Sequence, residues 1–143
     1  MDHIVYLDAK AKELDLLLTS QKTMIIRGAT GRKIPYGRVD AGDVLYFINN
    51  NAEGLVLGKA KVSNVILSDK LTEEESTRIV TENQVNLQLT KQQFDRWAGK
   101  RYLVLIGVAD VEKTDPFRVD KRGFGNMDDW LPVEQIEKVM IKE

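Results

Sequence analysis

The residues best suited to chemistry in this 143-residue sequence are cations grouped in one segment near the amino terminus. Between Leu16 and Val39 the chain holds no acidic residue and five basic ones, Lys22, Arg27, Arg32, Lys33 and Arg38. The rest of the chain carries 16 basic against 22 acidic residues. A basic segment on an otherwise acidic domain attracts anions locally, because the fields of clustered like charges add. The alternative is that these side chains form an ordinary solvated face.

Residue types in this segment suit the recognition of phosphate groups and bases. The planar guanidinium of Arg27 can bond two phosphate oxygens or a base edge, whereas Lys22 supplies a point charge. Gly28 follows Arg27, so the backbone there can approach a ligand closely. Tyr36 is expected to be exposed, as a surface on which a base could stack. The alternative for Arg27 is a structural ion pair with an acidic residue such as Asp43.

Composition excludes several classes of reaction. The chain has no cysteine, which excludes a disulfide framework, a thiolate nucleophile and a sulfur metal site. Its single histidine, His3, lies at a terminus expected to fray, so imidazole catalysis and zinc binding are not expected. Asp128-Asp129 is predicted to form a turn or a cap. We expect no metal and no cofactor, so any chemistry must use Lys, Arg, Asp, Glu, Ser, Thr or Tyr.

The chain is expected to be a single cytoplasmic domain over residues 1–143. Its longest apolar run, Tyr102 to Ala109, has eight residues, far fewer than the roughly 20 that a bilayer span needs. The first residues lack the basic and apolar stretches of a secretory signal. We therefore expect no binding to membranes.

Hydrophobic periodicity predicts the elements that would position the cations. Strands are expected at His3–Leu7, Thr23–Arg27, Asp43–Ile48, Leu55–Leu67 (with a bulge or bend at Gly58) and Arg101–Val111, the last unit ending at Asp115-Pro116. In the second strand, alternation places Ile25 and Arg27 on one face and Ile26 on the other. The segment from Gly28 to Gly42 is expected to be a long loop.

Helix starts are marked by capping residues. Asp8 is expected to cap a helix that ends near Ser20. Two capping boxes follow, Thr72 with Glu75 and Thr90 with Gln93, and each predicts a helix. Another short helix is expected after Trp130-Leu131-Pro132, with Val133, Ile136 and Met140 on its apolar side. Trp97 and Trp130 are expected to lie in the core.

The order of these elements favours an α+β fold. Strands and helices do not alternate regularly, which argues against a doubly wound parallel sheet. Long, nearly all-apolar strands joined by tight turns favour a mixed or antiparallel sheet curled into a small barrel. We predict such a pseudo-barrel, with helices covering its openings.

Four short motifs, in this order along the chain, resemble the ASCH domains of the PUA-like superfamily. They are Leu18–Arg27 with its Lys22-Thr23 pair, Gly42-Asp43 before an apolar strand, a strand with Gly58, and the strand Tyr102–Ile106. The resemblance covers Ile4 to Val111. It implies a small pseudo-barrel that binds RNA or a nucleotide-like ligand in a cleft beside the first helix.

The first functional hypothesis is therefore a non-catalytic domain that binds RNA or a modified nucleoside. The cleft would be formed by the end of the first helix, the strand from Lys22 to Arg27 and the glycine-rich loop. The expected ligand-binding residues are Lys22, Arg27, Gly28, Arg32, Lys33, Tyr36 and Arg38.

Two alternatives stay open. Some ASCH proteins that the chain resembles hydrolyse the amide of acetylated cytidine with Lys, Thr and Glu, which implies Lys22, Thr23 and Glu74 as catalytic candidates here. The threonine expected three residues after the lysine is Ile25 in this chain, and an alkyl group cannot act as the nucleophile. The second alternative is a protein–protein adaptor that uses the acidic segment Asp69–Glu75.

Overall fold

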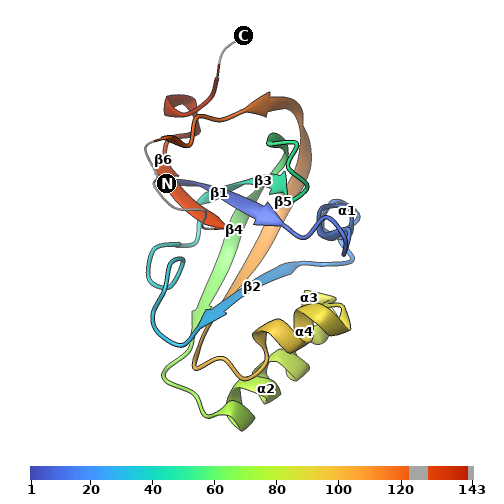
Figure 1. Ribbon diagram of the computed structural model, residues 1–143, viewed down its shortest axis with the longest axis vertical. Coiled ribbons are helices and arrows are strands. Elements are labelled where there is room, and N and C mark those ends of the chain that lie inside the picture. The colour runs from blue at the N-terminus through green and yellow to red at the C-terminus, as the bar shows by residue number, and fades with distance from the viewer. Residues whose placement is uncertain (123–128, 142–143) are drawn as a thin grey trace.

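The computed structural model describes residues 1–122 and 129–141 and contains one curled six-stranded sheet (Figure 1). The strands are β1 (Asp2–Leu7), β2 (Met24–Ala29), β3 (Val44–Asn49), β4 (Leu55–Leu67), β5 (Tyr102–Arg118) and β6 (Trp130–Glu134). Their order in the sheet is β2-β5-β4-β3-β1-β6. β1 and β3 run parallel and the other neighbours run antiparallel. The predicted α+β class with a curled mixed sheet is confirmed.

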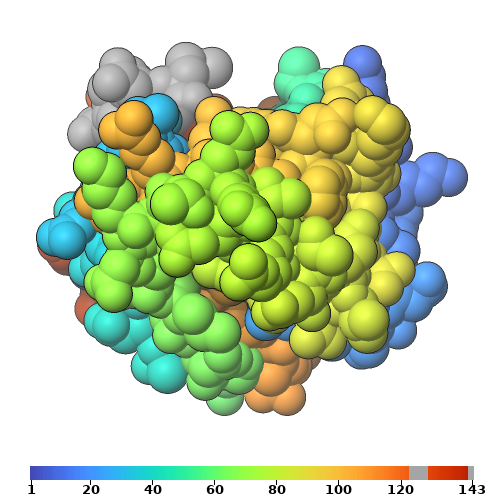
Figure 2. Space-filling model, turned by 90° about the horizontal axis from the view of Figure 1, so that it is seen from below, coloured from blue at the N-terminus to red at the C-terminus, as the bar shows by residue number. Residues whose placement is uncertain are grey.

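Short helices cover one end of this sheet. α1 (Glu13–Leu18) follows β1, and α2 (Glu73–Glu82), α3 (Gln84–Leu87) and α4 (Lys91–Trp97) lie between β4 and β5 in the chain. Figure 2 shows the surface of α2 beside that of α3 and α4 across this end. Both predicted capping boxes are present, at Thr72 and Thr90. In the part of the chain that the structure describes, no helix has the length and apolarity to cross a lipid bilayer.

Apolar side chains fill the inside of the curled sheet. Ile25, Phe47 and Ile106 have no exposed surface there, and Leu14 of α1 packs into the same cluster. A Cβ atom at Gly58 would lie 3.2 Å from Leu14 Cδ1, so glycine leaves the room that α1 needs. Gly58 also adjoins register shifts on both sides of β4, which confirms the predicted bulge.

The two faces of β2 enter different clusters. Ile25 points into the sheet interior, whereas Met24 and Ile26 pack outward against Leu87 and Trp97 beneath α2, α3 and α4. The predicted alternation along this strand is therefore confirmed. Trp97 and Trp130 are both buried, also as predicted.

The first helix and β5 differ from their predicted bounds. Asp8 caps only a turn, in which its Oδ1 accepts the Ala11 N–H at 3.0 Å. Lys12 then adopts a left-handed conformation with φ of 54°, so the helix starts at Glu13. β5 continues through Pro116 because its register with β4 shifts there, and an irregular ladder position requires no N–H donor.

The carboxyl-terminal segment forms a strand where a short helix was predicted. Residues Trp130–Glu134 pair with β1 as β6, an edge strand, where Pro132 is tolerated. The helical part shrinks to a single 3₁₀ turn at Ile136–Lys138. The local apolar spacing predicts a helix, but pairing with β1 prevails. Asp128 lies outside the described residues.

His3 is fully buried, contrary to the expectation of a frayed terminus, because β1 is paired on both sides. Its Nε2 lies 2.8 Å from Asp43 Oδ2, and Trp130 Nε1 donates to its Nδ1 at 3.1 Å. An indole N–H can only donate, so Nδ1 carries no proton and Nε2–H donates to Asp43. Burial lowers the pKa of His3, although the hydrogen bond and charge of Asp43 oppose this. Folding therefore favours the neutral imidazole.

This burial predicts a stability that declines in mild acid. The unfolded chain takes up a proton near the ordinary pKa of 6.5, whereas folded His3 does so only at lower pH. Between about pH 7 and pH 5 the free energy of unfolding, measured with urea, should fall by more in the natural chain than in His3→Gln. The same pH dependence in both proteins would contradict this account.

Candidate functional site

Arg27, in β2, lies between two surface cavities. The first, of about 310 Å³, is lined by the loop after β2 and is named the loop cavity. The second, of about 540 Å³, is lined by residues around the start of α1 and is named the α1 cavity. Both cavities share the wall residues Arg27, Arg96, Trp97 and Asp129. The two cavities therefore form one groove with Arg27 at its centre.

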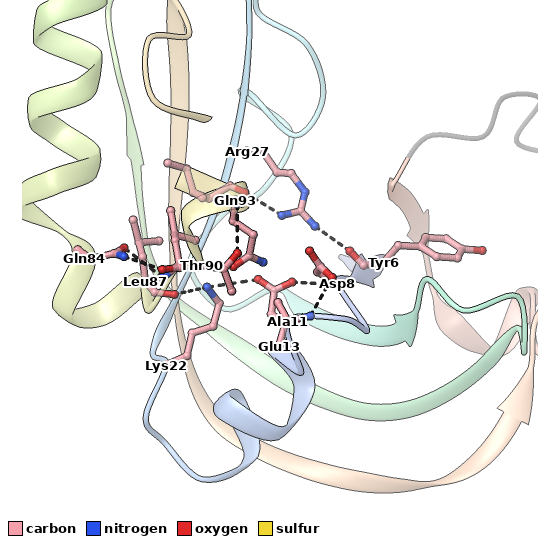
Figure 3. A network of polar contacts seen from close by, with 12 residues as sticks. Tyr6, Asp8, Ala11, Glu13, Lys22, Arg27, Gln84, Leu87, Thr90 and Gln93 are labelled. Atoms are coloured by element: carbon pink, nitrogen blue, oxygen red, sulfur yellow. Dashed lines mark hydrogen bonds and ion pairs between the residues drawn. The ribbon is translucent and has the colours of Figure 1, made fainter. Parts of the chain in front are cut away.

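The Arg27 side chain joins the two edges of the curled sheet. Its Nη2 donates to the Tyr6 carbonyl of β1 at 2.8 Å and its Nη1 to the Ile26 carbonyl at 2.7 Å (Figure 3). The guanidinium carbon lies 5.7 Å from the ring centre of Trp97 and 5.6 Å from that of Trp130. β2 and β6 are the edge strands, so this one side chain contacts both.

Asp129 sits between two arginines at the centre of the groove. Its Oδ2 lies 3.3 Å from Arg27 Nε and 3.7 Å from Arg96 Nη2. The contact with Nε is ionic only, because this buried nitrogen has no hydrogen-bond partner. Arg96 lies over the Trp97 ring at 4.3 Å. The acidic partner of Arg27 is thus Asp129, whereas Asp43 is bound to His3.

The loop cavity combines basic side chains with aromatic rings. Lys33 and Lys100 line it together with Tyr36 and Tyr102, whose rings meet edge to face at 5.7 Å. Arg32 lies over both of these rings, 5.7 and 5.6 Å from their centres. Such a wall can pair with an anion and stack on an aromatic ligand.

Tyr36 is half-buried, whereas the sequence suggested an exposed ring. Its hydroxyl donates to the Ser68 carbonyl, which draws the ring against the sheet. Gly28 also has a packing role, since a Cβ atom there would lie 2.8 Å from Leu103 Cδ2. Both residues still line the loop cavity.

Lys22 is buried behind the α1 cavity. Its Nζ lies 3.3 Å from Glu13 Oε2 and also donates to the Leu87 carbonyl (Figure 3). Glu13 Oε1 accepts the Asp8 N–H at 3.0 Å, so both carboxylate oxygens are engaged. Burial lowers the pKa of Lys22, and the nearby charge of Glu13 opposes that effect. Glu13 lines the α1 cavity, but Lys22 does not.

The remaining predicted site residues lie apart from the groove. Arg38 is exposed and lines neither cavity. The Thr23 hydroxyl donates to Asn86 Oδ1 at 3.3 Å. Glu74 is exposed on the first turn of α2, and no described contact joins it to Lys22. The carboxylate beside Lys22 is that of Glu13.

Sequence reasoning missed several residues of the groove. Arg96 and Lys100 come from α4 and the turn after it, distant in sequence from the basic segment. Lys100 lies beyond the end of α4, so no helical spacing in the sequence pairs it with Arg96. Across residues 1–122 and 129–141, no group of three His, Asp or Glu side chains is placed to hold a metal ion.

Comparison with known proteins identifies the fold. No protein-family model matches the chain, and no curated protein does. The crystal structure of ASCH from Zymomonas mobilis is similar, with a TM-score of 0.68 and 15% identity over 96% of this chain and 90% of that one. The N-terminal domain of McrB from Staphylothermus marinus has a TM-score of 0.54 and 11% identity over 96% and 90%. The expected ASCH-type fold is thereby confirmed.

The Lys22–Glu13 pair predicts a specific pattern of stabilities. Lys22→Met should lower the free energy of unfolding by about 3 kcal/mol, because Glu13 would remain buried without its countercharge. The double variant Lys22→Met, Glu13→Gln should recover most of that loss, since a neutral amide can still accept the Asp8 N–H. Urea denaturation measures both. A double variant as unstable as the single one would contradict the pairing.

Proposed function

We propose that this chain binds RNA or a modified nucleoside in the groove formed by the loop cavity and the α1 cavity. The observation that carries the proposal is the gathering of cations and aromatic rings around one concave site. Arg27, Arg96 and Lys100 supply positive charge there, and the rings of Trp97 and Tyr102 line the same walls. Cations bind phosphate groups, and aromatic rings stack on bases.

The size and charge of the groove support this ligand class. Volumes of about 310 and 540 Å³ fall in the range of ordinary small-molecule sites. The whole chain has a net charge of −1, so attraction of an anion must be local to the groove. The resemblance to ASCH domains implies the same ligand class.

The proposed contacts revise the set expected from the sequence. Arg27, Gly28, Lys33 and Tyr36 are kept as wall residues. Arg32 lines neither cavity and contacts the Tyr36 ring. The walls add Arg96, Trp97, Lys100 and Tyr102. Lys22 acts indirectly, by holding Glu13 in the wall of the α1 cavity.

We propose that the chain is a binding domain and not an amidohydrolase. A buried lysine beside a carboxylate is a feature of catalytic sites, but Lys22 is only 1% exposed and donates to a backbone carbonyl. Ile25 lies in the sheet interior and offers no hydroxyl. Incubation with acetylated cytidine should therefore yield no free cytidine. Turnover that disappears in Lys22→Ala would overturn this preference.

Cations inside and outside the groove should differ in their effect on RNA binding. Arg96→Ala and Lys100→Ala should each weaken binding of a short single-stranded RNA, and each should reduce the slope of log K against log salt by about 0.7. Arg38→Ala is the matched control, because it removes the same charge from an exposed site outside both cavities. Isothermal titration calorimetry at several salt concentrations measures both quantities.

The comparison has a clear contrary outcome. If Arg38→Ala weakens binding as much as Arg96→Ala does, the RNA is held by a diffuse surface charge and the groove is not its site. If single-stranded RNA and free nucleosides all fail to bind at low salt, the proposed function is wrong.

A further inference from the structure

We infer that the groove receives an internal phosphodiester of a single-stranded nucleic acid between Arg27 and Arg96, where the Asp129 carboxylate now lies. One nucleoside would then occupy the loop cavity and its neighbour the α1 cavity. Asp129 would act as an intramolecular competitor that the phosphate displaces. This inference rests on the proposed function and names the part of the ligand that the centre of the groove recognises.

Asp129 fits its two arginines poorly. Arginine and carboxylate normally meet in short, paired hydrogen bonds, as Arg122 and Asp120 do elsewhere in this chain, with distances of 2.7 to 3.1 Å. Asp129 instead stands 3.3 Å from Arg27 Nε and 3.7 Å from Arg96 Nη2, and neither contact is a hydrogen bond. Its side chain is 38% exposed, so it can leave this position for solvent.

The Nε–H donor of Arg27 is unsatisfied. This residue is only 7% exposed, and two of its nitrogens donate to the carbonyls of Ile26 and Tyr6. Nε is buried without an acceptor, and leaving such a donor unpaired costs free energy. A phosphodiester has two non-bridging oxygens, so it can accept from Arg27 Nε and Arg96 Nη2 at once.

The two cavities meet at the arginines. Arg27, Arg96 and Asp129 form the wall that both cavities share. A phosphate at this wall therefore has one cavity on each side. The loop cavity offers the rings of Tyr36 and Tyr102. The α1 cavity offers the amide of Gln92 and the NH₂ groups of Asn50 and Gln93, whose oxygens accept the Ala9 and Thr90 N–H groups. A ring wall suits stacking, and amides suit the edge of a base.

A single nucleoside would use only half of this groove. The fitting ligand is thus at least a dinucleotide unit. RNA and single-stranded DNA share this phosphodiester, so the chemistry at the centre of the groove is common to both.

Replacement of Asp129 separates this inference from a general effect of charge. The probes are the dinucleoside monophosphates UpU, CpC, ApA and GpG, the matching free nucleosides, and the deoxy dinucleotide TpT, all titrated by calorimetry at low salt. Asp129→Asn should tighten binding of the best dinucleotide on the order of tenfold, because a competing anion has been removed. The affinity of Asp129→Asn for the free nucleoside should equal that of the natural chain.

Two further variants serve as controls. Asp95→Asn removes the same charge from the exposed face of α4, where Asp95 pairs with Lys91, and should leave dinucleotide affinity unchanged. Arg96→Ala, at a side chain 64% exposed, should weaken binding of the dinucleotide but not of the free nucleoside, and should leave the melting temperature near that of the natural chain. This second variant keeps the test decisive if Asp129→Asn proves unstable.

Each outcome has a defined meaning. The inference is wrong if Asp129→Asn leaves dinucleotide affinity the same or lower, if Asp95→Asn matches its gain, or if nucleosides bind as tightly as dinucleotides. In those cases binding of RNA itself still stands. If neither dinucleotides nor a longer RNA bind, the proposed function fails and the inference fails with it. UpU binding more tightly than TpT would identify RNA as the source of the phosphodiester.

Discussion

The guanidinium of Arg27 is the contact on which the rest of this structure depends. Within residues 1–122 and 129–141, the curled sheet has two free edges, β2 and β6, and no ladder of backbone hydrogen bonds joins them. Arg27 spans that gap by donating to the Tyr6 carbonyl, and it lies against Trp97 on one element and Trp130 on another. A buried cation is stable only when its donors and its charge are matched. The carbonyls of Tyr6 and Ile26 and the rings of Trp97 and Trp130 supply much of that match, and Nε is left without an acceptor.

The gap between the two sheet edges also accounts for the cavities at the surface. A single side chain, and not a paired strand, spans the gap between the sheet edges. Cavities therefore remain on both sides of Arg27. Behind the α1 cavity, the Lys22–Glu13 pair ties the start of α1 to the Leu87 carbonyl of α3. The buried side chains of Arg27 and Lys22 thus hold the walls of the groove, and the exposed cation Arg96 lies at its rim.

Local signals in the sequence were enough for much of the fold. Thr72 and Thr90 begin helices because their hydroxyls accept N–H groups only three residues away, and β4 has the bounds that its apolar run predicts. Features that need distant segments could not be predicted in this way. His3 is buried only because β3 and β6 flank β1, and Asp129 meets Arg27 only because the sheet curls. The basic segment pointed to Arg27 and Lys33, but Arg96 and Lys100 reach the groove through the packing of α4.

The placement of Trp97 and Trp130 has a practical consequence. They are the two tryptophans of the chain, and both rings face the same buried cation, at 5.7 and 5.6 Å. Trp130 is further tied to the imidazole of His3. Indole emission responds to nearby charge and to solvent, so the intrinsic fluorescence of the unlabelled protein comes from the two sides of this one junction. The wavelength and intensity of this emission therefore report whether the two sheet edges are held together.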